Sequence, residues 1–201
     1  MNSESNKSIA GRVAEHGSWP AERRYVAGRD TMGLGELWAP SPQRCLPVAL
    51  GDILTSDRIK VPLVGATSQD VVRELVDLLV ESGDLRDRDE VLAAIVSREQ
   101  TRSTGVGGGL AIPHAKTSQV SDLIMAVGMC ATPVDFHSID GLGVRLVVML
   151  ISPEEMTLRH IRVLRRVTGM MGLSSVRGQL LEAQSADALY DVIRQYEATA
   201  A

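Results

Sequence analysis

Two short apolar runs, residues 123–130 and 144–151, constrain the fold of this chain more than any other feature. Both are rich in Val, Leu, Ile and Met, and turn signals such as Pro133 and Asp140-Gly141 separate them. Runs of this length and composition are typical of buried strands. Segments with the spacing of amphipathic helices precede and follow them. This alternation predicts an α/β fold in which helices cover a central β-sheet.

The helices are predicted from apolar residues that recur at intervals of three and four. The first has Thr67 as its N-cap, Asp70 in an arrangement close to a capping box, and Gly83 at its end. Its apolar positions are Val71, Val72, Leu75, Val76, Leu78 and Leu79. Further helices are predicted over residues 89–100 and 154–171, around Leu180, and around Leu189 with Ser185 as a cap.

Composition restricts both the core and the class of partner. Aromatic residues make up 3% of the 201 residues and hydrophobic residues 44%, so the core must be aliphatic. The formal net charge of −4 argues against a broad footprint on nucleic acid. The two cysteines, Cys45 and Cys130, lie far apart, which indicates neither a disulfide framework nor a Cys-rich zinc site.

The chain is expected to have two parts. Residues 1–47 contain both tryptophans and half of the eight prolines without a sustained apolar period. They are predicted to be a weakly ordered N-terminal extension with one short helix around Ile9 to Glu15, and a docking or self-association arm is the alternative. Residues 48–201 form the folded domain. No apolar run approaches the roughly 20 residues of a membrane-spanning helix, and no secretory signal is visible, so we expect a cytoplasmic protein without direct membrane insertion.

Residues 98–116, REQTRSTGVGGGLAIPHAK, carry the densest chemical signal. Their four glycines, Gly105 and Gly107 to Gly109, predict a loop with positive φ and exposed amides that can bind an anion. The segment lacks the GKS or GKT that closes a P-loop, and Leu110 stands where a dinucleotide fingerprint needs its third glycine. Both nucleotide-binding interpretations therefore fail.

Pro113 and His114 follow a short apolar strand predicted over residues 110–112. Because proline cannot donate to a sheet ladder, it is expected to end or edge that strand and to leave His114 near the strand's exit. A neutral imidazole beside amides and arginines is suited to accepting a phosphoryl group. On the residues alone, a structural role for His114 remains equally open.

These residues resemble the active-site signature of the enzyme IIA domains of the fructose/mannitol class in the bacterial phosphotransferase system. The signature has Arg-Glu at 98–99, Ser-Thr-Gly-Val-Gly at 103–107, a further glycine at 109, and an apolar strand ending in Pro-His at 113–114. The resemblance continues beyond this segment and covers about residues 50–196. It implies the mannitol-type enzyme IIA fold, an α/β fold with a central mixed β-sheet flanked by helices on both faces.

The resemblance also implies roles for single residues. His114 aligns with the histidine that accepts a phosphoryl group from the histidine phosphocarrier HPr, through Nε2. Arg98 aligns with the active-site arginine, and His160 with a second histidine that orients the phosphohistidine. The phosphoryl-binding loop would consist of Ser103, Thr104, Gly105, Gly107 and Gly109. No metal and no cofactor is implied, because the donor already carries an activated phosphoryl group.

Three functions are considered for such a domain. Residues 50–55 and 182–193 look more like the nitrogen-regulatory branch of the family, in which phosphorylation controls contacts with a regulatory target protein. The alternative is a free-standing sugar-specific component that passes the phosphoryl group to the cysteine of a IIB domain for fructose- or mannitol-type uptake. A binding domain that no longer accepts phosphate is disfavoured by the intact His114, Arg98 and His160.

Three further residues are assigned more ordinary roles. Lys116 is expected to be a solvated side chain and His137 a surface loop residue. Cys130 is expected to be a small core residue, because the anion-binding loop of a phosphocysteine does not surround it. Arg102 is left open between a site residue and a surface residue.

Overall fold

The computed structural model describes residues 48–199. The extension predicted over residues 1–47, with its short helix, lies outside the described residues. The elements, with η marking 3₁₀ turns, are η2 (Leu50–Asp52), η3 (Ser56–Arg58), β1 (Ile59–Leu63), α1 (Ser68–Glu81), α2 (Arg88–Thr101), β2 (Gly105–Gly107), β3 (Leu110–Ala111), β4 (His114–Lys116), β5 (Ile124–Val134), β6 (Val144–Ser152), η4 (Glu154–Met156), α3 (Thr157–Gly172), α4 (Ser174–Glu182) and α5 (Ala186–Thr199).

The strands form one 6-stranded sheet with the order β1-β5-β6-β3-β2, and β4 also pairs with β6. β5 and β6 are antiparallel, whereas β3 and β4 run parallel to β6 and β1 runs parallel to β5. β6 is therefore paired along both of its edges, and apart from Arg145 all of its residues are buried. This arrangement confirms the predicted mixed central sheet.

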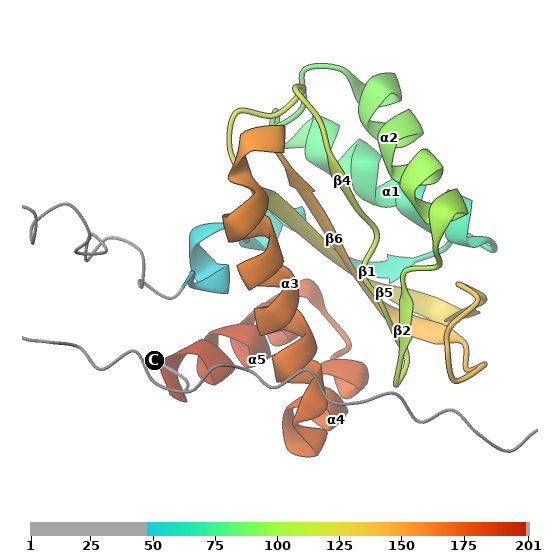
Figure 1. Ribbon diagram of the computed structural model, residues 1–201. Helices are drawn as coiled ribbons and strands as arrows, with labels where there is room; N and C mark the ends of the chain where they lie inside the picture. Colours follow the sequence, from blue (N-terminus) through green and yellow to red (C-terminus); the bar gives the residue numbers. More distant parts are fainter. Residues whose placement is uncertain (1–47, 200–201) are drawn as a thin grey trace, which may run out of the picture. The chain divides into compact units, whose positions relative to one another are not determined.

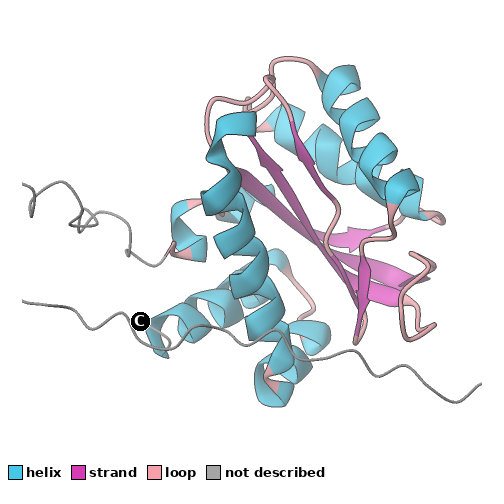
Figure 2. Ribbon diagram, in the orientation of Figure 1, coloured by secondary structure: helices cyan, strands magenta, loops and turns pink. Residues whose placement is uncertain are grey.

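Helices cover both faces of this sheet, as predicted. Figure 1 shows α1 and α2 on one side and α3 and α5 on the other, and Figure 2 shows the strands between the two helical layers. Each layer forms an apolar cluster with one face of the sheet, and within the described residues Phe136 is the one aromatic member of the buried core.

Consecutive residues of β6 enter opposite clusters, as the two-residue repeat of a strand requires. Leu146, Val148 and Leu150 lie on the α3 side and Val147, Met149 and Ile151 on the α1 side.

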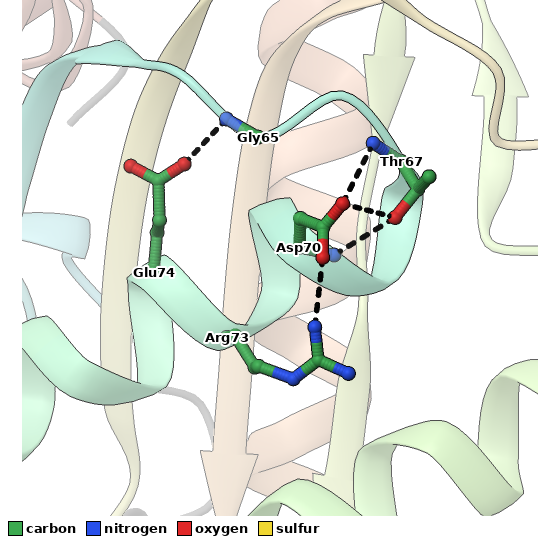
Figure 3. Close-up of polar contacts among 5 residues, drawn as sticks. All are labelled: Gly65, Thr67, Asp70, Arg73 and Glu74. Atoms are coloured by element: carbon green, nitrogen blue, oxygen red, sulfur yellow. Dashed lines mark hydrogen bonds and ion pairs between the residues drawn. The ribbon is translucent and has the colours of Figure 1, made fainter.

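The start of α1 shows how local sequence positions an element (Figure 3). Thr67 Oγ1 accepts the Asp70 amide at 3.2 Å, and Asp70 Oδ2 accepts the Thr67 amide at 3.2 Å, which completes the predicted capping box. Glu74 Oε1 accepts the Gly65 amide at 2.6 Å and so ties the loop after β1 to the helix. Gly83, with φ of 79°, ends the helix where the sequence predicted.

Three strands were not predicted, and one helix boundary was wrong. β1 contains Pro62 and pairs only with β5, so it is an edge strand with a weak local pattern. β2 and β4 have three residues each. Their strand conformation depends on pairing with other strands and not on an alternation of apolar residues. The helix predicted from Glu154 begins at Thr157, because residues 154–156 form the 3₁₀ turn η4.

We predict that Gly128→Ala destabilises the fold by about 1–3 kcal/mol, the usual range for overpacking a core. A Cβ at this position of β5 would lie 2.7 Å from Cγ of Leu63, a side chain that is 1% exposed. Urea denaturation followed by circular dichroism measures the loss. Gly51→Ala is the control, because a Cβ there meets nothing within 4 Å. Equal losses in the two variants would contradict the packing argument.

Candidate functional site

The site begins where Pro113 separates β3 from β4. Leu110 and Ile112 belong to the apolar cluster under α3, whereas Ala111 and Ala115 belong to the cluster under α1. The alternation therefore directs His114 to the face that α3 covers. His114 was predicted to lie near the exit of a strand. The structure differs, because the chain pairs with β6 again from His114 onward. Pro113 lacks a donor, but its carbonyl still accepts the Leu150 amide at 3.0 Å.

His114 is held in one tautomer. Its Nδ1 lies 2.8 Å from the carbonyl oxygen of Ile112. A carbonyl oxygen can only accept, so Nδ1 carries the proton and Nε2 carries the lone pair. Burial lowers the pKa of His114 below its ordinary value of 6.5, and the charge of Arg98 lowers it further. Near neutral pH the residue is therefore a neutral imidazole with a nucleophilic Nε2.

His160 lies beside His114. Its ring is 3% exposed, and the centroids of the two rings are 5.4 Å apart at an interplanar angle of 59°. Nδ1 of His160 is 2.8 Å from Oγ of the buried Ser152, which is the last residue of β6. Burial lowers the pKa of His160 to about 4, with smaller contributions from protonation of His114 and from the charges of Lys116 and Arg98. The second histidine of the signature is thus also neutral near pH 7.

The two predicted residues His114 and Arg98 line one hollow of about 530 Å³. The same hollow is lined by Arg102, so this arginine is near the site rather than remote from it. Arg98 comes from the last turn of α2, where its Nη1 donates to the Arg102 carbonyl at 2.8 Å. Leu164 and Thr168 of α3 also line this hollow.

The predicted phosphoryl-binding loop is brought only partly to this hollow. Ser103, Thr104 and Gly105 line it, whereas Gly107 and Gly109 do not. Gly107 instead lines a second hollow with Gly108. The chain forms β2 at residues 105–107 and turns at Gly107 to Gly109, all three of which have positive φ.

Several amides predicted to be exposed for an anion are already paired. Gly105 N–H donates to Ser103 Oγ at 3.1 Å, and Gly108 N–H donates to Asp140 Oδ2 at 2.7 Å. The amides of Gly108 and Leu142 both donate to the Asp140 carboxylate and lower its pKa, the Gly108 amide more strongly. The prediction of free amides is therefore wrong at these two glycines, because the turn is satisfied by the protein itself.

The remaining candidates near the signature are placed as follows. Lys116 is exposed, and its Nζ donates to Thr157 Oγ1 at 2.7 Å, so it contacts the start of α3. His137 has a side chain 85% exposed and lies on the wall of the hollow. Cys130 is buried, which raises its pKa to about 11 and confirms it as a core residue.

The described residues 48–199 lack two further kinds of feature. No group of three or more His, Cys, Asp or Glu side chains in this part of the chain could hold a metal ion. Within the same range, no helix is both long and apolar enough to cross a membrane.

Glu99 is the site residue whose contacts sequence reasoning missed. It follows Arg98 in the signature, but its role was not predicted. Its two carboxylate oxygens accept from the amide and the hydroxyl of Thr104, at 3.1 and 2.5 Å. The Arg-Glu pair was a signal for it, although only the fold shows which group it binds.

Fold and site together define an α/β protein that carries two neighbouring neutral imidazoles, one on β4 and the other on α3, the helix that follows β6. A family model described as "Phosphoenolpyruvate-dependent sugar phosphotransferase system, EIIA 2" matches residues 52–196. The chain belongs to this family, as the resemblance predicted.

The chain is similar to relatives that have different roles. The fructose-specific EIIABC component of the phosphotransferase system (PTS) in Bacillus subtilis is 38% identical over 146 residues, which are 73% of this chain and 23% of that protein. The chain thus spans less than a quarter of that relative. A nitrogen regulatory protein of Pseudomonas aeruginosa is 34% identical over 146 residues, which are 73% of this chain and 95% of the other. The crystal structure of mannitol IIA from Escherichia coli, 23% identical, has a TM-score of 0.60 and covers 70% of this chain and 98% of the other, which confirms the mannitol-type fold.

We predict that His160 makes folding stability depend on pH between about 4 and 6.5. Unfolded, the residue regains its ordinary pKa of 6.5, so in this window the unfolded chain binds a proton that the folded chain, with a pKa of about 4, does not. Stability is unaffected by this residue above pH 6.5 and falls as the pH is lowered toward 4. The full loss is about 3 kcal/mol, from a shift of roughly 2.5 pKa units.

The measurement is urea denaturation of the wild type and of His160→Gln at a series of pH values from 4 to 7.5. Glutamine does not titrate, so the stability of the wild type relative to the variant should decrease as the pH falls. A difference that is constant across this range would contradict the prediction.

Proposed function

We propose that this domain is a cytoplasmic phosphoryl carrier of the phosphotransferase system that accepts a phosphoryl group from phospho-HPr on Nε2 of His114. The observation that carries the proposal is the 2.8 Å hydrogen bond from Nδ1 of His114 to the Ile112 carbonyl. It leaves the lone pair on Nε2, on a ring that burial keeps neutral. Membership of the EIIA type 2 family supports the same reaction.

The transfer balances without a cofactor. The lone pair of His114 Nε2 forms the new N–P bond while the N–P bond of the donor breaks, and its electron pair returns to the donor imidazole. Nδ1–H of His114 stays bound to the Ile112 carbonyl throughout. Arg98 and Arg102 supply positive charge to the three phosphoryl oxygens, and His160 lies where it can orient the group.

For the output, we favour protein regulation over sugar transport. The chain covers 95% of a nitrogen regulatory protein at 34% identity, and residues 50–55 and 182–193 resemble that branch. A phosphoryl group adds roughly −1.5 to −2 charges to the hollow, which is enough to make or break an interface. In the alternative, the domain passes the group to the cysteine of a IIB domain, and the fructose-specific relative supports this second candidate.

We predict that phosphoenolpyruvate, enzyme I and HPr label the wild type with one phosphoryl group, and that His114→Ala removes the label. Intact-mass spectrometry or radiolabelled phosphoenolpyruvate detects the adduct. The control is His137→Asn, which removes an exposed imidazole from the wall of the same hollow and tolerates the positive φ of 50° there. The control should be labelled like the wild type, whereas normal labelling of His114→Ala would refute the assignment.

We also predict that the phosphorylated and unphosphorylated forms retain different proteins in pull-downs. His114→Ala, carried through the same phosphorylation mixture, is the matched control and should behave like the unphosphorylated form. Identical partners with identical affinity would contradict the regulatory output. Transfer of the label to the cysteine of a purified IIB domain would instead establish the sugar-specific alternative.

A further inference from the structure

A chain of hydrogen bonds runs from Glu99 to the reactive imidazole. Its first step joins Glu99 to Thr104, a residue that is 3% exposed. The Thr104 amide donates to Oε1 of Glu99 at 3.1 Å, and the Thr104 hydroxyl donates to Oε2 at 2.5 Å. Glu99 lies near the end of α2, so this two-point contact fixes the segment that leaves the helix.

The second step joins that segment to the strand that carries the site. The carbonyl of Thr104 accepts the amide of Ile112 at 3.0 Å. Ile112 lies between β3 and β4, and its carbonyl continues the chain of hydrogen bonds. That carbonyl accepts Nδ1–H of His114 at 2.8 Å. The Ile112 residue thus connects Thr104 directly to the imidazole.

Glu99 also acts on His114 through its negative charge. Glu99 is close enough to His114 for its negative charge to favour the protonated ring, while Arg98 opposes it. Adjacent residues of α2 therefore act on the imidazole with opposite signs. Arg98 binds the Arg102 carbonyl, whereas Glu99 binds Thr104, whose own carbonyl accepts the Ile112 amide. The carboxylate is consequently placed to act on the orientation of His114 as well as on its charge.

We propose that Glu99 is a positioning residue that, through Thr104 and the Ile112 residue, holds His114 in its Nδ1–H tautomer and so keeps the lone pair on Nε2. Its consequence for phosphoryl transfer rests on the proposed function. The effect on the tautomer does not, because it is a property of the unphosphorylated protein.

The test uses ¹⁵N-labelled full-length protein and long-range ¹H–¹⁵N spectra near pH 7.5, in which the two ring nitrogens report the tautomer of His114. Glu99→Gln leaves a single acceptor, and Thr104→Val removes the hydroxyl while keeping the shape of the side chain. Both should shift His114 toward a mixture of tautomers. Thr104→Ser keeps the hydroxyl and should retain the wild-type spectrum. Glu90→Gln is the matched control, because Glu90 lies at the other end of α2, where it accepts from Gln119 at 2.6 Å.

Phosphorylation kinetics give the second readout. In Glu99→Gln and Thr104→Val, kcat for transfer from phospho-HPr should fall about tenfold with KM little changed. A tenfold loss is the lower end of the effect of removing residues that orient a metal-bound histidine through a hydrogen bond. A wild-type tautomer in both variants, each shown to be folded by circular dichroism, would overturn the proposal. If instead the tautomer shifts but even the wild type takes no phosphate, the proposed function fails while the positioning role stands.

Discussion

The register between β6 and the strand that carries the site is the constraint on which the rest of the site depends. Leu110 pairs with Leu146 and His114 with Leu150, so β3 and β4 keep one parallel register across Pro113. The proline removes a single donor without shifting the strand. A slip of one residue would turn His114 to the α1 face and destroy the site. Burial of β6 on both faces, with paired strands on both edges, prevents such a slip.

The same central strand also positions the second imidazole. β6 ends at Ser152, and the turn η4 reverses the chain into α3 over the face to which His114 points. His160 lies in the first turns of that helix, where the Ser152 hydroxyl binds its Nδ1. Two histidines 46 positions apart in sequence therefore meet because one lies on a neighbour of β6 and the other on the helix that β6 feeds.

Features set by local interactions could mostly be predicted from the sequence, whereas features set by contacts between distant segments could not. The capping box of Thr67 and the apolar period of α1 are local, and both were predicted correctly, as was burial of the two long strands. β1 and β4 depend on partners far along the chain, and β2 is a three-residue strand that pairs with the adjacent β3. Their residues, such as Pro62 or Gly105, show no strand pattern of their own. For the same reason the glycine loop was expected to offer free amides. Its partner Asp140 comes from a distant loop that the sequence does not connect to it.

The candidate site was predicted largely through the resemblance, and the structure adds the physical reason why it can work. An acceptor of a phosphoryl group needs positive charge to attract the donor and a neutral nucleophile to attack it. A single protonated histidine could meet only the first requirement, because its lone pair would be occupied. Here Arg98 and Arg102 carry positive charge at the hollow, and burial, with a further contribution from the charge of Arg98, lowers the pKa of both His114 and His160. In the proposed function, attraction of the donor therefore falls to the arginines and attack to the neutral imidazole of His114.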